Sequence, residues 1–210
     1  MKGREKIAFY SSPKIQAILI DVKDILKNYR FAENQEIMTL QPIHQDLHMQ
    51  KILYNKIDEE YKYFFIDFEG DPRLSMEEKK QKYPSEKDFG SFLRSLSYIK
   101  FDALLRFIEE RFIGKDEYRV PEEFLFSLYF KKAAKITKKD KTLEHFLSLL
   151  NYWEGSMKDR FLNEKLEIDV NLISYFTIER ALYELDYELL YRPNKLIIPI
   201  LGLKEIIDRF

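Results

Sequence analysis

The sequence PIHQDLHMQKILYNKIDEEYKYFFIDFEGDPR (42–73) joins a polar segment to two runs of residues that favour β-strands. The runs are KILYNKI (51–57) and YKYFFIDF (61–68), and the acidic DEE (58–60) lies between them. β-Branched and aromatic residues on both sides of a short polar segment predict a β-hairpin. GDPR (70–73) then reads as a turn, because glycine and proline interrupt regular structure.

Polar side chains flank both ends of this hairpin. His44, Asp46 and His48 precede its first strand, and Asp67 ends its second. Because a hairpin returns its two ends to the same edge, we expect Asp46 and Asp67 to be neighbours in space. Two converging carboxylates suit phosphoryl transfer, in which one orients a hydroxyl group and the other holds Mg²⁺ against a phosphate.

Other interpretations of the polar segment stay open. His44 and His48 have the i, i+4 spacing of zinc ligands on a helix, but Gln45 stands where that motif requires Glu, and Pro42 argues against a helix. The histidines could instead satisfy backbone groups of a loop. An acid pair for glycoside hydrolysis would need a sugar cleft between the carboxylates.

Composition restricts the class of protein. The chain has 210 residues, with 17 Phe, 14 Tyr and a net charge of −1, which indicates one domain with a substantial core and no nucleic-acid partner. The absence of cysteine excludes disulfides and thiolate zinc sites. Without a membrane-length apolar stretch or a signal-peptide core, we expect a cytoplasmic protein with no membrane partner.

The remainder of the chain shows helical periodicity. Pro13 opens a pattern that predicts a first helix over 13–30, and helical patterns dominate 85–210. With the loop, hairpin and turn of 43–74 between them, we expect a single domain (1–210) that is mainly α with a small β-hairpin.

The pattern over 171–191 has two different faces. One face carries Ile178, Leu182, Leu185 and Leu189. The other carries Arg180, Tyr183, Tyr187 and Tyr191. Tyrosine offers an apolar plane and a hydroxyl, which suits a sugar, although a second packing face explains the pattern equally well. Pro193 ends this helix, and LIIPILGL (196–203) reads as a short apolar tail.

The loop and hairpin resemble the catalytic segment of protein-kinase-like folds, in which H-R-D-x-x-x-x-N is followed by D-F-G. Analogous places, with Glu69 as one extra residue, are filled by His44, Asp46, Asp67, Phe68 and Gly70.

Four blocks resemble more closely the maltokinases, sugar kinases related to aminoglycoside phosphotransferases and often linked to trehalose synthase. HQDLHMQKIL (44–53) is similar to H-G-D-L-H-L-G-Q-x-L, and IDFEGDP (66–72) to I-D-F-E-G-E-P. KDFGSFLRSLSY (87–98) is similar to R-D-V-A-G-M-L-R-S-F-D-Y. ERALYELDYELLYRPNKLIIPILGL (179–203) is similar to K-A-x-Y-E-x-x-Y-E-x-x-x-R-P-x-W-x-x-I-P-L-x-G.

The resemblance implies ATP- and Mg²⁺-dependent phosphorylation of maltose, or a similar sugar, at the anomeric hydroxyl. It implies that Asp46 is the catalytic base or hydroxyl orienter, that His48 lies near the sugar or Asp46, and that Asp67 binds Mg²⁺. His44 and Asp88 would brace the catalytic loop. The sugar pocket would be lined or braced by Tyr183, Glu184, Tyr187 and Arg192.

One departure concerns the metal. Lys51 stands where the family has an Asn or Gln magnesium ligand, and Gln50 precedes it. Protonated lysine cannot bind Mg²⁺. Either the loop shifts so that Gln50 reaches the metal, or this metal position is lost and the Lys51 ammonium supplies part of its charge in the cofactor site.

A second departure concerns length. The residues before His44 do not suffice for the N-lobe of a kinase-like fold, so we expect the C-terminal lobe alone, with the N-lobe absent. The open interlobe surface of such a lobe predicts association with a separate N-lobe polypeptide or with a second copy. The alternative function is a catalytically inactive sugar-binding or scaffolding subunit.

Overall fold

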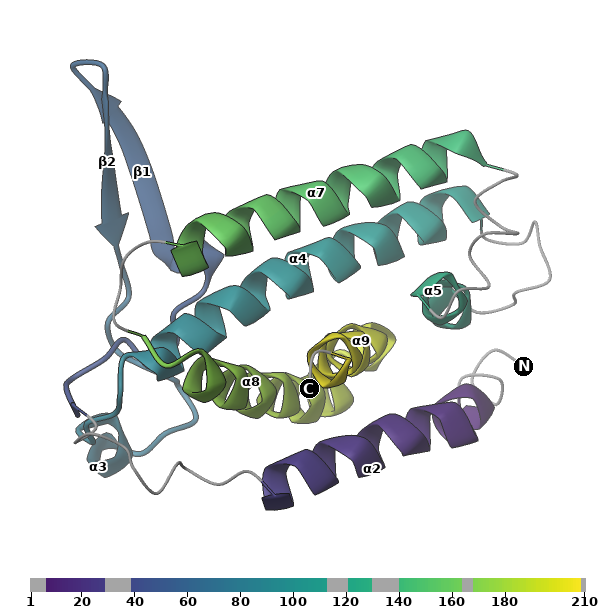
Figure 1. Cartoon of the computed structure of the whole chain (residues 1–210), viewed down its shortest axis with the longest axis horizontal. Helices are drawn as coiled ribbons and strands as arrows, with labels where there is room; N and C mark the ends of the chain where they lie inside the picture. Colours follow the sequence, from purple (N-terminus) through teal and green to yellow (C-terminus); the bar gives the residue numbers. More distant parts are fainter. Residues whose placement is uncertain (1–6, 29–38, 113–120, 130–139, 164–167, 209–210) are drawn as a thin grey trace.

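The fold is a helical body with one projecting β-hairpin, seen in a computed structural model that describes residues 7–28, 39–112, 121–129, 140–163 and 168–208 (Figure 1). The elements are, in chain order, α2 (Pro13–Asn28), η1 (Met49–Lys51), β1 (Ile52–Ile57), β2 (Glu60–Phe65), α3 (Met76–Lys79), α4 (Glu86–Phe112), α5 (Pro121–Tyr129), α7 (Lys141–Asn163), α8 (Val170–Tyr191), η2 (Pro193–Lys195) and α9 (Ile197–Ile207). The prediction of a mainly α protein with a small hairpin is confirmed.

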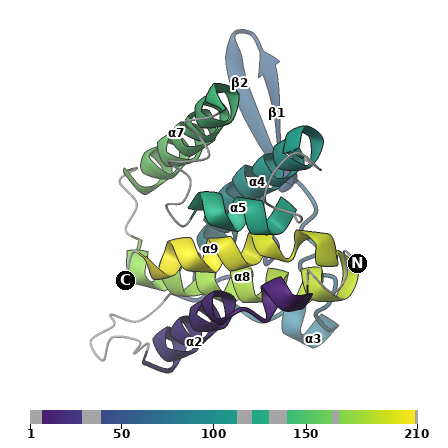
Figure 2. The same cartoon turned by 90° about the vertical axis from the view of Figure 1, so that its right-hand side faces the viewer.

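Helix α9 is the centre of the core. It contacts α2, α4, α5 and α8, and the view in Figure 2 shows it surrounded by them. Its residues Ile197, Ile198, Leu201 and Leu203 are fully buried. The prediction of an apolar tail over 196–203 is therefore wrong. A helix buried on all sides shows no amphipathic period, so its sequence cannot be distinguished from an irregular apolar run.

The predicted hairpin is present and exposed. Strands β1 and β2 pair antiparallel, and Asp58 and Glu59 connect them with positive φ values of 50° and 67°, as a type I′ turn requires. Every residue of β2 is exposed, including the large apolar side chains of Phe64 and Phe65. A two-stranded hairpin is marginally stable by itself, so this surface suits a covering partner.

The predicted first helix begins at Pro13 as expected and is described as far as Asn28. Residues 29 and 30 of the prediction lie outside the described residues. Within the part of the chain that the structure describes, no helix has the length and apolar character needed to cross a membrane.

Helices α4 and α8 lie against each other at Gly90 with no room for a side chain. A Cβ atom at this position would lie 2.8 Å from the backbone nitrogen of Thr177 and 2.9 Å from the carbonyl carbon of Phe176. Because these neighbours are backbone atoms of α8, they cannot move aside without shifting the whole helix. Gly90 therefore sets the separation of the two helices.

We expect Gly90→Ala to lower the free energy of unfolding by about 1–3 kcal/mol, the usual cost of overpacking. Gly155→Ala in α7 is the matched control, because nothing lies within 4 Å of its added Cβ. That substitution should raise stability by up to about 1 kcal/mol through better helix propensity. Urea denaturation measures both, and equal effects of the two variants would contradict the close approach at Gly90.

Candidate active site

The loop that carries Asp46 is fastened to the first turn of α4 by Asp88. The Asp88 carboxylate accepts hydrogen bonds from the backbone N–H groups of His44 (2.6 Å) and Gln45 (2.9 Å). Asp88 is buried, and this burial raises the pKa of its carboxyl while the two N–H donors act in the opposite direction. These two hydrogen bonds fix the position and orientation of the loop on the first turn of α4.

His44 joins the same loop to the segment that follows β2. Its Nε2 atom donates a hydrogen bond to the carbonyl of Ile66 at 2.9 Å, and its ring lies 4.9 Å from the ring of Phe68. Gln45 adopts a φ of 65°, a conformation that favours glycine, and its side-chain amide donates to the carbonyl of Lys79 at 2.9 Å. The strained backbone is thus held by a side-chain contact.

The two carboxylates predicted to be neighbours meet at one ammonium group. Lys51 Nζ forms an ion pair with Asp67 and lies 3.7 Å from Asp46 Oδ2. The hydrogen bond to Asp67 raises the pKa of Lys51, and the same contact lowers the pKa of Asp67. The Lys51 ammonium therefore lies between the carboxylate of the loop and that of the segment after β2.

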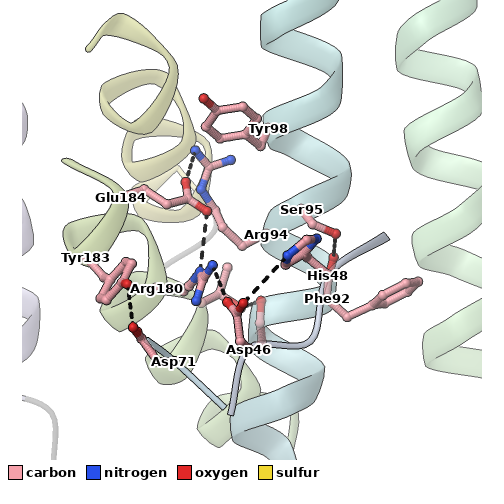
Figure 3. A network of polar contacts seen from close by, with 12 residues as sticks. Asp46, His48, Asp71, Phe92, Arg94, Ser95, Tyr98, Arg180, Tyr183 and Glu184 are labelled. Atoms are coloured by element: carbon pink, nitrogen blue, oxygen red, sulfur yellow. Dashed lines mark hydrogen bonds and ion pairs between the residues drawn. The ribbon is translucent and has the colours of Figure 1, made fainter. Parts of the chain in front are cut away.

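On its other side Asp46 is paired with Arg180 of α8. Arg180 Nη2 lies 2.9 Å from Asp46 Oδ1, and its Nε lies 3.7 Å from Glu184 Oε1 (Figure 3). Glu184 in turn lies 2.8 Å from Nη2 of Arg94, which is 1% exposed. Burial raises the pKa of Glu184, and the Arg94 guanidinium opposes that shift. A continuous series of alternating charges leads from the core to the loop that carries Asp46.

Sequence analysis did not assign a role to Arg180 or Arg94 in this network. The blocks that carry the resemblance contain a basic residue at both positions. Arg180 opens the segment R-A-x-Y-E, where the family pattern has another basic residue, and Arg94 stands at an Arg of the pattern over 87–98. What the sequence did not reveal is which acidic residues they contact.

A cleft of about 630 Å³ opens beside Asp46, between the loop, α4 and α8. This volume lies within the range of roughly 300–1,000 Å³ that is typical of small-molecule sites. Its walls include all four residues predicted to line or brace a sugar pocket, which are Tyr183, Glu184, Tyr187 and Arg192. His48 and Gln50 also line it. The lining does not include His44, Lys51, Asp67 or Asp88.

The tyrosines of the cleft are held in place by polar neighbours. Tyr183 donates a hydrogen bond to Asp71 Oδ1 at 2.8 Å, and the guanidinium of Arg73 lies 3.2 Å from the centre of its ring. Tyr98 donates to Glu188 Oε1 at 2.6 Å. Burial raises the pKa of both phenols, so they remain protonated donors at neutral pH.

The arrangement does not fit a divalent metal. Mg²⁺ requires carboxylate or amide oxygens at about 2.0–2.1 Å, whereas Oδ2 of Asp67 pairs with the Lys51 ammonium, and the two oxygens of Asp46 face Lys51 and Arg180. Gln50, the other predicted ligand, lines the cleft. Among the described residues, no group of three or more His, Asp or Glu side chains is placed to hold a metal ion, which also counts against the zinc interpretation of His44 and His48.

Comparison with known proteins shows a kinase-like fold. No family model matches the chain. A glucosamine kinase (crystal form B) superposes on 99% of this chain with a TM-score of 0.54 and 18% sequence identity. A structure of glucosamine kinase in complex with glucosamine, ADP and inorganic phosphate aligns with a TM-score of 0.49 and 15% identity over 93% of this chain. The chain spans 44% and 47% of these proteins, respectively.

His48 provides a pH-dependent test of the site. Its ring nitrogen Nε2 lies 3.7 Å from Asp46 Oδ2, yet burial lowers its pKa, helped by Arg180 and Lys51. The unfolded chain binds this proton near pH 6.5, whereas the folded chain binds it only at lower pH. The free energy of unfolding should therefore decrease as pH falls below about 6.5, and His48→Gln should remove that part of the decrease.

Histidine ring resonances in an NMR titration measure the pKa directly. A value at or above that of free histidine for His48 would contradict the half-buried position of its ring beside two cations.

Proposed function

We propose that this chain is the C-terminal, sugar-binding lobe of a kinase-like phosphotransferase. Its substrate would be maltose or a similar neutral sugar, phosphorylated at the anomeric hydroxyl with ATP as the donor. The observation that carries this proposal is the position of Asp46 at the edge of a tyrosine-lined cleft, on a loop built like the catalytic loop of kinases.

The charges of the cleft favour a neutral ligand. Its lining contains as many basic side chains as carboxylates, namely Arg106, Arg180, Arg192 and Lys195 against Asp46, Asp102, Glu184 and Glu188. These groups are paired with one another: Arg192 lies 2.6 Å from Glu188, and Lys195 lies 2.7 Å from Asp102. A charged ligand would have to break such pairs, whereas sugar hydroxyls can hydrogen-bond to them as they stand.

Asp46 is suited to orient the acceptor hydroxyl. Arg180 holds one carboxylate oxygen, and the other lies near His48 and Lys51, so the group is fixed in direction. Phosphoryl transfer depends chiefly on positioning and charge stabilisation, and a fixed carboxylate beside a sugar cleft supplies the first of these.

Sugar binding is the first test. Calorimetric titration with maltose should give saturable binding, stronger than with glucosamine, because the cleft holds no unpaired carboxylate for an amino group. Tyr187→Ala should weaken maltose binding about tenfold, a change of ~1.4 kcal/mol, through loss of an aromatic face. Tyr152→Ala is the control, because Tyr152 is 75% exposed on α7. Undetectable binding of every sugar by the unmodified chain would end the proposal.

The hairpin indicates where a partner would bind. Exposed aromatic side chains cover both of its strands, among them Tyr54, Tyr63 and Phe65. Since the chain corresponds to only 44% of the glucosamine kinase, more than half of that protein has no counterpart here. We assign the exposed hairpin to contact with a separate N-lobe polypeptide, which would also carry most of the ATP site.

The transfer reaction is tested by mixing the chain with a candidate N-lobe polypeptide. Maltose-dependent release of ADP should appear only in the mixture, and Asp46→Asn should reduce it by a factor of about 10² or more, as expected for a positioned acid–base group. The sugar affinity of this variant, measured separately, distinguishes a slower transfer step from weaker sugar binding. Equal rates with Asp46→Asn would exclude a role for this carboxylate in transfer.

A second candidate function is favoured by one observation. The Lys51 ammonium contacts Asp67, the residue to which the family resemblance assigns a metal ion. A sugar-binding or scaffolding subunit without catalytic activity would retain the cleft and tolerate this change. Maltose binding without ADP release in any mixture would favour this second function.

A further inference from the structure

The backbone of Lys51 is held on both sides, which fixes where its side chain begins. Its N–H donates to the carbonyl of His48 at 2.8 Å, and its carbonyl accepts from the N–H of Ile66 at 3.0 Å. Ile66 directly precedes Asp67. The residue that carries the ammonium is therefore tied to the catalytic loop and to the Asp67 segment at the same time.

The ammonium itself is shared by two carboxylates. The Lys51 side chain is 17% exposed, and its Nζ atom contacts Asp67 while lying 3.7 Å from Asp46. An isolated surface ion pair contributes little because the two side chains lose freedom in forming it. Here one cation serves two carboxylates from segments that would otherwise repel each other, so its removal affects the arrangement of both.

We infer that the Lys51 ammonium is the resident cation of this site, holding Asp46 and Asp67 together in place of a divalent metal ion. The same oxygens cannot bind the ammonium and Mg²⁺ at once, because the metal needs them at a shorter distance and in octahedral order. Lys51 therefore holds Asp46 and Asp67 together whether or not a metal ion is present in solution. The inference rests on the proposed function only for its consequence that sugar binding in the adjoining cleft needs no metal.

The direct test is binding of Mn²⁺ without nucleotide, followed by electron paramagnetic resonance of the free ion. The unmodified chain should show no saturable binding at this site. Lys51→Asn removes the ammonium and supplies an amide oxygen beside two carboxylates, so it should bind Mn²⁺ at least about tenfold more tightly, or ~1.4 kcal/mol. Asp67→Asn in the same variant should abolish that gain.

Lys56→Asn is the matched control, because Lys56 lies on β1 and forms an exposed pair with Glu59. It should leave Mn²⁺ binding unchanged. Equal Mn²⁺ affinity of the unmodified chain and Lys51→Asn would overturn the inference, and so would the absence of any binding by Lys51→Asn.

A stability measurement covers the case in which Lys51→Asn folds poorly. Lys51→Met should lower the melting temperature, and adding Asp67→Asn should restore part of the loss, because the unpaired carboxylate is then removed. Independent, additive effects of the two substitutions would contradict the shared cation.

Maltose titration in the presence of EDTA separates the inference from the proposed function. Unchanged affinity is expected, and a requirement for Mg²⁺ would overturn the inference while leaving the sugar site intact. If no sugar binds under any condition but Lys51→Asn gains Mn²⁺ binding, the proposed function is contradicted. The inference that the Lys51 ammonium is the resident cation is then still supported.

Discussion

The pair of hydrogen bonds from the His44 and Gln45 backbone to the Asp88 carboxylate is the contact on which the site depends. It fixes the loop at the start of α4, two residues before Gly90, where the backbone of α8 leaves no room for a side chain. The start of α4 therefore positions the loop on one side of the cleft. Through Gly90 it also sets the distance to α8, which lines another side. The block over 87–98 therefore positions the groups of the site through Asp88 and Gly90, and it also lines the cleft with Ser95 and Tyr98.

The alternating charges act as one unit that joins core to site. Arg94 is almost fully buried beside Gly202 of α9, where an added Cβ would lie 2.7 Å from its Cζ atom. Its charge is balanced by Glu184, which also contacts Arg180, and Arg180 holds Asp46. Removing one member of a buried ionic series leaves its neighbours uncompensated, which costs more than the lost contact. Arg94, which is not among the lining residues of the cleft, can thus influence the direction of the Asp46 carboxylate.

Sequence analysis recovered what depends on local pattern. The hairpin was predictable because its strand residues surround a short polar turn, and the proximity of Asp46 and Asp67 followed from hairpin geometry. Helix α9 was missed because full burial erases amphipathic periodicity. The partners of Arg180 were missed because they depend on how α8 lies against the loop, and no spacing along the chain encodes that contact. Lys51 stood out as a departure from the family pattern, but only the structure shows its ammonium between the carboxylates.

The position of Lys51 has different consequences for sugar recognition and for phosphoryl transfer, which a sugar kinase combines in one site. Recognition of a sugar needs a rigid cleft, and an internal cation makes the loop rigid without any metal. Transfer of a phosphoryl group needs positive charge that can follow the developing negative charge on the phosphate. An ammonium already engaged by two carboxylates has little charge to offer a third anion. Under the proposed function, the contact that holds Asp46 and Asp67 together would therefore slow phosphoryl transfer, unless a partner supplied positive charge near Asp46.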